Sequence, residues 1–366
     1  MRNCVFARPN LLAVLLAFLW LSIGEKPIHG QQERPQDAFG EWRETTDVAS
    51  LGWSRERLRD LSEYVDSIGS ASVLIVTQNK VVFSHGDLTK PYRAHSIRKS
   101  FLSALIGIAI DEGKIDLAGT LTDLEIGEKT PLTDAEGLAM VADLLKARSG
   151  VYLPAASETK EIVAGRPQRH QYSPGEHWFY NNWDFNALGT IYRRQMDEDI
   201  FVAVESRIAK PIEMQDFDLE HTRYQLEDVS QHPSYKFRIS TRDLARFGLL
   251  YLNKGKWSGE EVIPAKWVEE STQVHSLTGS SGTKSGYGMM WWVNADRDSQ
   301  IPLEQGAFTA SGTGGQRLTV LPSLETVIVH RVDTDDKDGP RVGTSGYHRF
   351  LSRVMAARST AVDQDP

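Results

Sequence analysis

The sequence predicts an α+β fold in which strands from both ends of the chain build one sheet and helices fill the middle. Two β-rich runs, 72–77 and 81–84, lie towards the amino terminus, and three more, 287–293, 316–321 and 326–332, lie towards the carboxyl terminus. Between them the apolar residues mostly recur with helical periodicity. Because strands bury their apolar faces against other elements, we expect one sheet formed by the two ends, with an inserted helical region.

The amino-terminal elements have clear start and stop signals. Ser54 caps a helix expected over 54–68, and Gly69 ends it. The two β-rich runs that follow are separated by Gln78-Asn79-Lys80, which predicts a hairpin.

The middle of the chain is predicted to be helical. Thr133 and Glu136 form a capping box for a helix expected to reach Ala147. Residues 150–176 are polar and rich in glycine and proline, so we expect a long surface loop there. Further helices are expected over 182–196, 240–252, 264–271 and 342–357, followed by a polar tail over 359–366.

Residues 1–30 have the features of an export signal. Arg2 and Arg8 precede an apolar run over 11–23 that is short for a membrane span, and small residues near Gly24 and Gly30 offer cleavage sites. We expect export to the periplasm or the extracellular space after cleavage, with no stable membrane span. An uncleaved amino-terminal anchor is the alternative.

Composition excludes several classes of function. The 366 residues are 40% hydrophobic and 25% charged, which is ordinary for a soluble globular protein. A net charge of -8 gives no basic footprint for nucleic acid. The single cysteine, Cys4, lies within the export signal, so the mature chain has no disulfide, thiol nucleophile or thiolate metal site.

The helix expected over 96–112 opens with two residues that catalysis can use. Ser96 and Lys99 are three residues apart and share one face of its first turn, and its apolar body indicates burial. A desolvated lysine can activate a serine hydroxyl. The same spacing occurs at Ser157–Lys160 and Ser281–Lys284, but without an apolar helix. The alternative is a capping serine beside a surface lysine.

Two later stretches carry candidate chemistry. Tyr180 could share the base role with Lys99, and Asn182 begins the next helix; the alternative is a buried tyrosine followed by a capping asparagine. The run from Ala310 to Gln316 is rich in glycine and opens a strand, where a free N–H could donate to an oxyanion. A glycine-rich turn without a ligand is the alternative there.

In their order along the chain, Ser96-x-x-Lys99, Tyr180-x-Asn182 and the glycine-rich strand resemble the serine β-lactamase-related family. This family includes class C β-lactamases, D-Ala-D-Ala peptidases and family VIII esterases. The resemblance extends over about residues 50–355. Further matching motifs are Ser149-Gly150, Ser173-Pro174-Gly175, the run from Ser240 to Gly248, Tyr287-Gly288 with Trp291-Trp292, and Gly314-Gly315-Gln316 running to Pro322.

The resemblance implies a β-lactamase/transpeptidase-like fold: a mainly antiparallel sheet flanked by helices, with an inserted all-helical region and the site between them. In a single domain, 45–95 and 272–358 form the α/β part and 96–271 the helical part. The roles implied for the site are Ser96 as acylated nucleophile, Lys99 and Tyr180 as base system, Asn182, Ser311 and Gly312 as substrate-binding residues, and the N–H groups of Ser96 and Thr313 as oxyanion hole.

One motif departs from the family. The third element is usually Lys-Thr-Gly or a His or Trp variant, whereas the matching position is Ala310-Ser311-Gly312. Lys284 begins a literal Lys-Ser-Gly, but it precedes the wrong strand. The missing cation favours ester or amide hydrolysis over β-lactamase or D-amino-acid peptidase activity, which remain the alternatives. Arg317 and Arg331 are candidates to restore the charge.

No metal or other cofactor is expected. The acidic run 333–339 has the wrong register for a calcium loop and lacks its closing glutamate, so we expect a solvated loop near the site. We expect His95, His177 and His330 to be structural.

The sequence therefore predicts an exported serine hydrolase for a small ester, amide or peptide substrate. A hypothesis of another class is a non-catalytic cell-envelope binding module on the same fold. The complete Ser96, Lys99 and Tyr180 set favours the enzyme, because a binding module needs none of their chemistry.

Overall fold

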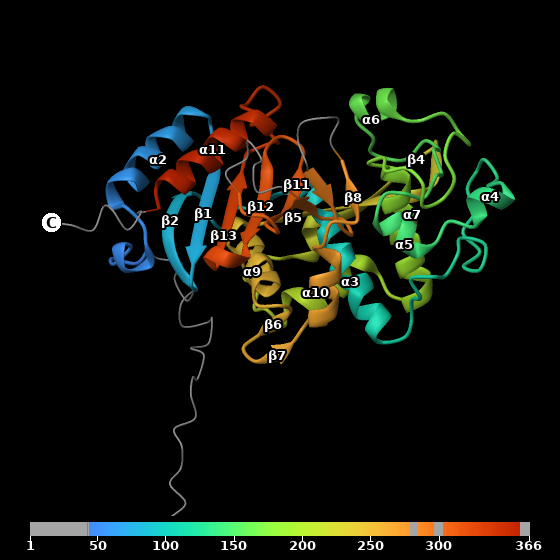
Figure 1. Cartoon of the computed structure of the whole chain (residues 1–366), viewed down its shortest axis with the longest axis horizontal. Coiled ribbons are helices and arrows are strands. Elements are labelled where there is room, and N and C mark those ends of the chain that lie inside the picture. Colours follow the sequence, from blue (N-terminus) through green and yellow to red (C-terminus); the bar gives the residue numbers. More distant parts are fainter. Residues whose placement is uncertain (1–41, 43, 279–284, 296–302, 359–366) are drawn as a thin grey trace, which may run out of the picture. The chain divides into compact units, whose positions relative to one another are not determined.

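The computed structural model describes residues 42, 44–278, 285–295 and 303–358. Within them an eight-stranded antiparallel sheet forms the centre of the molecule (Figure 1). Its strands are β1 (Ser72–Thr77), β2 (Lys80–Gly86), β8 (Ser276–Leu277), β9 (Ser285–Tyr287), β10 (Trp292–Asn294), β11 (Phe308–Gly312), β12 (Gln316–Leu321) and β13 (Thr326–Arg331). Their order is β2-β1-β13-β12-β11-β10-β9-β8. Because β1 pairs with β13, the predicted sheet from both ends of the chain is confirmed.

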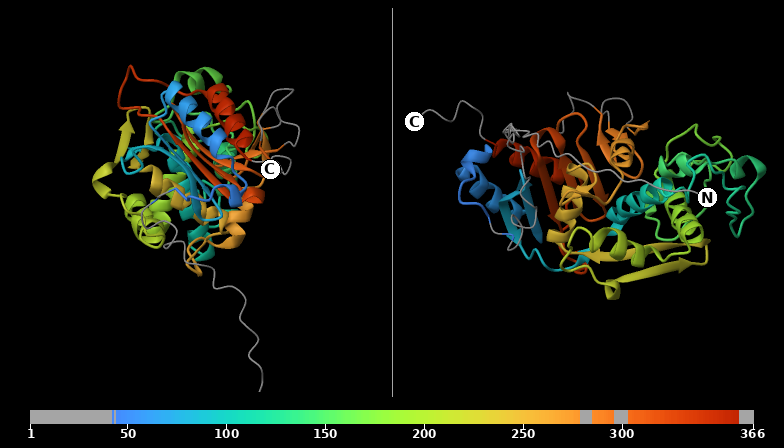
Figure 2. Two further views of the ribbon diagram at one scale, coloured as in Figure 1. Left: turned by 90° about the vertical axis from the view of Figure 1, so that its left-hand side faces the viewer. Right: turned by 90° about the horizontal axis from the view of Figure 1, so that it is seen from below.

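One face of the sheet is covered by α2 (Arg55–Ser67) and α11 (Thr344–Ala356), which pack side by side (Figure 2). Ser54 caps α2 by accepting a hydrogen bond from the Arg57 backbone, as predicted. Side chains alternate along a strand, so Val73 and Ile75 of β1 pack under these helices in one apolar cluster.

The intervening residues of β1, Leu74 and Val76, belong to the larger core on the opposite face. There α9 (Thr241–Leu252) crosses β1, β12 and β13, and α3 (Arg98–Asp111) lies almost wholly buried. Gly248 lets α9 approach the sheet, since a Cβ at this position would lie 2.6 Å from Val327 Cγ1. This packing fixes α3, and with it the turn that carries Ser96, against the sheet.

The expectation that 96–271 is all-helical is wrong, because the region also contains strands. A second sheet in this region, in the order β3-β5-β4, contains β4 (Thr222–Glu227) and β5 (Ser230–Ile239). Its third strand, β3 (Tyr92–Arg93), comes from just before Ser96. Pro233 obscured the strand signal in the sequence; it lies beside a register shift between Gln225 and Glu227, where the ladder is already interrupted.

The remaining helices of this region are short except for one. They are α4 (Asp134–Gly137), α5 (Val141–Leu145), α6 (Lys160–Gly165), α7 (Asn182–Met196), α8 (Ile200–Ala203) and α10 (Ala265–Ser271), with a small hairpin of β6 (Lys256–Trp257) and β7 (Glu260–Glu261). The predicted capping box at Thr133 is present, but its helix stops after one turn. The predicted loop over 150–176 contains α6.

The strand predicted over 287–293 is two strands, because the chain turns between β9 and β10. Met290 has a left-handed backbone, with φ 64°. Ser100 and Ser103 of α3 donate hydrogen bonds to the carbonyls of Met290 and Met289, at 3.0 and 2.8 Å. These contacts depend on the distant helix α3, so the local strand pattern could not reveal the break.

Residues 1–30, the predicted export signal, and the polar tail over 359–366 lie outside the described residues. Within the described part of the chain, no helix combines the length and apolar character that crossing a membrane requires.

Candidate active site

Ser96 lies in a tight 3₁₀ turn, His95–Ile97, that leads directly into α3. His95 has a left-handed backbone, with φ 48°, which is uncommon for a residue other than glycine. Its ring is 2.8 Å from the Thr334 hydroxyl, within hydrogen-bond distance, and burial lowers its pKa to about 4. The half-buried Ser96 opens onto a cavity of about 1060 Å³ that Tyr180, Asn182 and Thr313 also line.

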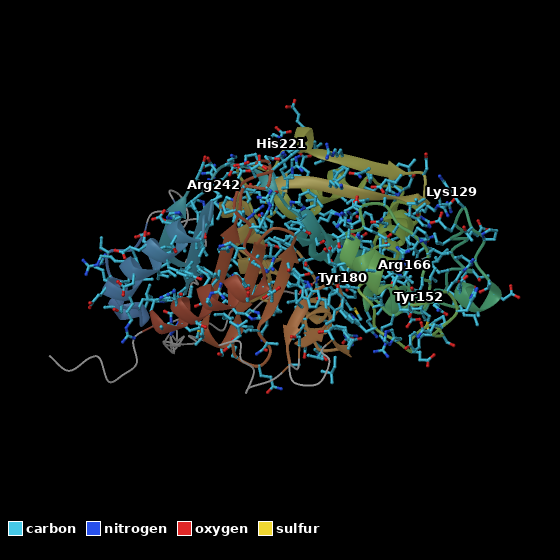
Figure 3. The ribbon with its side chains drawn as sticks, turned by 90° about the horizontal axis from the view of Figure 1, so that it is seen from above. Lys129, Tyr152, Arg166, Tyr180, His221 and Arg242 are labelled. Atoms are coloured by element: carbon cyan, nitrogen blue, oxygen red, sulfur yellow. The ribbon has the colours of Figure 1, made fainter. Side chains whose placement is uncertain are left out.

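Lys99 joins three of the predicted site residues. Its side chain is 2% exposed, and Nζ lies 3.0 Å from Ser96 Oγ, 2.7 Å from Tyr180 Oη and 3.0 Å from Asn182 Oδ1. Tyr180 and Asn182 are more than 80 residues from Lys99 along the chain. In Figure 3 Tyr180 lies where the sheet meets the helical region.

Burial and the nearby Arg98 guanidinium hold the pKa of Lys99 well below its ordinary value. Both effects disfavour the ammonium ion. Burial raises the pKa of Tyr180, so its phenol stays protonated. The hydrogen bond with Ser96 lowers that pKa by less than burial raises it. Nζ is placed to donate to each of three oxygens, Ser96 Oγ, Tyr180 Oη and Asn182 Oδ1. Asn182 Oδ1 can only accept a hydrogen bond, whereas either hydroxyl can also donate one.

Asn182 is the first residue of α7 and not its cap, which corrects the capping alternative raised from the sequence. Its neighbour Asn181 caps the helix by accepting from the Trp183 backbone. The Asn182 side chain donates from Nδ2 to the carbonyl of Ser157 at 2.8 Å. This bond fixes the amide so that Oδ1 faces Lys99.

Sequence reasoning missed the residues that hold this turn of α7. Asp184 is fully buried and accepts hydrogen bonds from Ser149 Oγ at 2.5 Å and from Asn181 Nδ2 at 2.7 Å. Burial raises the pKa of the Asp184 carboxyl well above its ordinary range. Ser149-Gly150 matches a family motif in the sequence, but the contact of Ser149 with Asp184, 35 residues away, has no local signal.

The end of β11 brings Ser311, Gly312 and Thr313 to the same cavity as Ser96. Gly312 packs against the Ser96 turn: a Cβ there would lie 2.8 Å from the carbonyl oxygen of Ala94 and 3.1 Å from His95 Cβ. Among the described residues, no hydrogen bond uses the backbone N–H of Ser96 or of Thr313. Both N–H groups are therefore available to a bound molecule.

Gly312→Ala tests this close approach. The added Cβ must displace β11 from the Ser96 turn, and misplacing reacting groups by about 1 Å costs on the order of 100-fold in rate. We expect kcat/KM for an ester to fall by about that factor. Gly127→Ala is the control, because its Cβ would meet only the flexible Gln231 side chain, at 3.7 Å. Equal activities of the two variants would show that the approach of β11 is unimportant.

Neither Arg317 nor Arg331 supplies an uncommitted positive charge in place of the cation that is missing at the third motif. Arg331 is buried away from the cavity and donates to Gln316 Oε1 and to the carbonyls of Ile239 and Arg93. Arg317 reaches the cavity, but its guanidinium donates to the carbonyls of Gly312 and Gln316. Burial lowers the pKa of both side chains, that of Arg331 to about 9. Both guanidinium groups therefore donate hydrogen bonds to backbone carbonyls at the ends of strands.

The other sequence candidates have structural contacts. His177 stacks on Tyr172, and His330 is buried beside Ser70 Oγ and the Gly315 carbonyl. Of the other two Ser-x-x-Lys matches, Ser157 lines the cavity and supports Asn182 through its carbonyl, whereas 281–284 lies outside the described residues. In the described ranges, no group of three or more His, Cys, Asp or Glu side chains could hold a metal ion.

Known proteins resemble this chain over most of its length. A 6-aminohexanoate-dimer hydrolase from Paenarthrobacter ureafaciens is 23% identical over 353 residues, covering 86% of this chain and 84% of that protein. Among solved structures, a class C β-lactamase has a TM-score of 0.62 at 13% identity, covering 87% of this chain and 99% of that chain. EstCE1, a hydrolase with promiscuous acyltransferase activity, has a TM-score of 0.60 at 16% identity, covering 85% and 99%.

These structures share the β-lactamase/transpeptidase-like fold with this chain. The family model described as Beta-lactamase matches residues 59–347, from within α2 to within α11, and includes every candidate site residue described above. The match covers well over half of the chain, so the protein belongs to the β-lactamase family of serine hydrolases.

Proposed function

We propose that the protein hydrolyses an ester or amide bond through an acyl-enzyme on Ser96, with Lys99 and Tyr180 as the base system. The observation that carries this proposal is the position of Lys99 Nζ, which is buried and within 3.0 Å of Ser96 Oγ, Tyr180 Oη and Asn182 Oδ1. A neutral amine in contact with a serine hydroxyl is the arrangement needed to make that hydroxyl a nucleophile.

In the first step the Ser96 proton passes to Lys99, directly or through Tyr180, as Oγ attacks the substrate carbonyl. The backbone N–H groups of Ser96 and Thr313 donate to the oxyanion that forms. The proton then returns through Tyr180 to the leaving oxygen or nitrogen, and the C–O or C–N bond breaks. Water, deprotonated by the same groups, releases the acid and regenerates Ser96.

Two observations favour an ordinary ester or amide over a β-lactam. The third motif has Ala310 in place of a cation, and the nearby Arg317 is bound to backbone carbonyls. The second is the likeness to the relative named 6-aminohexanoate-dimer hydrolase, because a dimer of 6-aminohexanoate is joined by a linear amide and not by a β-lactam. β-Lactamase or D-amino-acid peptidase activity is the alternative on the same catalytic groups.

The test combines labelling with a matched substrate panel. We expect a fluorophosphonate probe to label the wild-type protein on the peptide containing Ser96, and Ser96→Ala to remain unlabelled. We expect kcat/KM for 4-nitrophenyl butyrate to exceed that for nitrocefin. Equal labelling of the wild type and Ser96→Ala, or no turnover of any ester or amide, would contradict the proposal. Faster nitrocefin turnover would instead support a β-lactamase.

We also propose that residues 1–30 direct export to the periplasm or beyond. Its support is the sequence pattern of Arg2, Arg8 and the apolar run over 11–23. Mass spectrometry of the protein recovered from a cell that expresses the full chain tests it. An amino terminus near Gln31 outside the cytoplasm is expected, whereas a full-length protein in the cytoplasm would contradict export.

A further inference from the structure

Several basic side chains line the cavity beside Ser96, and only some of them are bound to backbone carbonyls or to carboxylates. Four of them are engaged: Arg93 and Arg238 both pair with Asp335, Arg317 donates to two carbonyls, and Arg341 donates to the carbonyls of Gly339, Pro340 and Asp336. Arg98, Arg223 and Lys236 also line the cavity. None of these three forms an ion pair with a carboxylate in the described part of the chain.

Arg98 is the most buried of the three. It is 5% exposed, and its guanidinium lies over the Tyr235 ring at 4.8 Å and donates from NH2 to Ser234 Oγ at 3.1 Å. Its Nε has no hydrogen-bond partner among the described residues. A buried donor without a partner is costly, and a buried guanidinium without a counter-charge is more so. Arg98 therefore places a charge without a carboxylate partner, among the described residues, in the wall of the cavity.

Arg223 and Lys236 face each other across the β4–β5 pair, where they are direct register partners. Like charges opposite one another on antiparallel strands destabilise the pair. Lys236 donates to the amide oxygen of Gln225, which is neutral. Burial, then Arg98 and Arg223, lower its pKa. An anion between the two strands and Arg98 would relieve this repulsion.

The acidic side chains nearby do not neutralise this cluster. Glu161 and Glu220 line the cavity but are exposed, and neither pairs with the cluster. Glu227 is close enough to raise the pKa of Lys236, but it accepts hydrogen bonds from the Ser157 backbone and Gln225 Nε2. Arg98 also lowers the pKa of both His95 and Lys99. The cavity wall next to Ser96 is therefore positive.

We propose that Arg98, Arg223 and Lys236 form an anion subsite, and that the substrate is an ester or amide carrying a carboxylate. This inference rests on the proposed function. It places the recognition of negative charge on β4, β5 and the first turn of α3, away from the third motif that lacks a cation. Arg98 and Ser96 line the same cavity, so one bound molecule can contact both.

The experiment uses three esters with the same number of chain atoms and a different terminal group: mono-4-nitrophenyl adipate, 4-nitrophenyl hexanoate and 4-nitrophenyl 5-(trimethylammonio)pentanoate. Charge-assisted hydrogen bonds to Arg and Lys give a preference of about tenfold or more. We therefore expect the wild type to have a kcat/KM for the adipate ester at least that much above the neutral ester, and the cationic ester to be poorest. High salt lowers the preference.

The variants are compared by the ratio of kcat/KM for the anionic ester to that for the neutral ester. We expect Lys236→Gln and Arg223→Gln each to lower this ratio several-fold, and Lys236→Glu to move the preference towards the cationic ester. Lys266→Gln, an exposed lysine of α10 outside the cavity, leaves the ratio unchanged.

The outcomes separate the two proposals. A wild type that hydrolyses the neutral and anionic esters equally, or variants that keep the wild-type ratio, would overturn the anion subsite while leaving hydrolysis through Ser96 intact. Loss of all three activities in Ser96→Ala, together with a charge preference in the wild type, supports both proposals. If the wild type hydrolyses none of the esters, the proposed function is contradicted. The substrate proposed for the anion subsite is then overturned as well, because it rests on that function.

Discussion

Lys99→Met is expected to reduce ester kcat/KM by about a thousandfold, since a positioned general base contributes roughly 10²–10⁴ in rate. Methionine fills a similar volume but has no lone pair able to accept the Ser96 proton. Because Lys99 is 2% exposed and the ammonium ion is disfavoured there, removing the amine relieves a desolvation cost, but it also takes the Nζ donor from Asn182 Oδ1. These effects oppose each other, so we expect a small change in the thermal unfolding temperature, with the activity lost.

Lys99→Arg distinguishes a base from a mere positive charge. A guanidinium stays protonated in proteins, so this variant keeps a cation but cannot accept a proton. If Lys99 is the base, Lys99→Arg is as inactive as Lys99→Met. Substantial activity in the arginine variant, with an unchanged unfolding temperature, would show that charge and not basicity is required.

The same argument fixes the sign of the pH dependence. In the proposed mechanism the active form is the neutral amine, and the folded-state pKa of Lys99 is lowered. Activity is therefore retained above that lowered pKa and lost as the pH falls through it, with a slope approaching tenfold per pH unit. The pH profile of kcat/KM for a neutral ester measures this limb. Activity that rises on acidification would contradict a neutral Lys99 base.

Tyr180→Phe has the second largest expected effect, a loss of about 100-fold in kcat/KM. The change removes the hydroxyl 2.7 Å from Lys99 Nζ but keeps the ring, which stacks on Trp292 and packs against Phe185. The ring contacts preserve the fold, so the loss reports proton transfer. In the proposed mechanism Tyr180 returns the proton to the leaving group, so we expect a larger loss for an amide than for a 4-nitrophenyl ester.

The matched control for Tyr180→Phe is Tyr251→Phe. Tyr251 is a buried tyrosine of α9 that packs against Phe247 and Trp291 and does not line the cavity. We expect Tyr251→Phe to keep the wild-type kcat/KM. Equal losses in the two variants would assign the effect to packing, and no loss in Tyr180→Phe would remove the phenol from the proposed mechanism.

Much of the candidate site follows from short-range patterns. The apolar body of α3 indicated its burial, and the spacing of Ser96 and Lys99 placed both on one turn, where Nζ and Oγ are 3.0 Å apart. Residues three apart at the start of a helix meet whatever the rest of the chain does. The caps at Ser54 and Ser240 were predictable for the same reason, because each side chain bonds a backbone N–H three residues away.

The proposed anion subsite shows the opposite case. Arg223 and Lys236 are unremarkable surface-type residues in the sequence, and their strands were not predicted. They become direct partners only because the β4–β5 hairpin forms. They face the Ser96 cavity only because β3, which comes just before Ser96 in the chain, pairs with β5. Which charged side chains lie opposite each other depends on the register between two paired strands. The local sequence of one strand does not specify that register.

The sequence by itself determined the elements whose hydrogen bonds are local: the capped helices, the β1–β2 hairpin and the Ser96–Lys99 turn. Tertiary structure decided which distant groups meet. It brings Tyr180 and Asn182 into contact with Lys99, allows Asp184 to accept a hydrogen bond from Asn181, and buries Arg331 in the core. Local bonds join residues a few positions apart, so the local sequence specifies them. Distant contacts depend on how whole elements pack, and packing is chosen by the complete core.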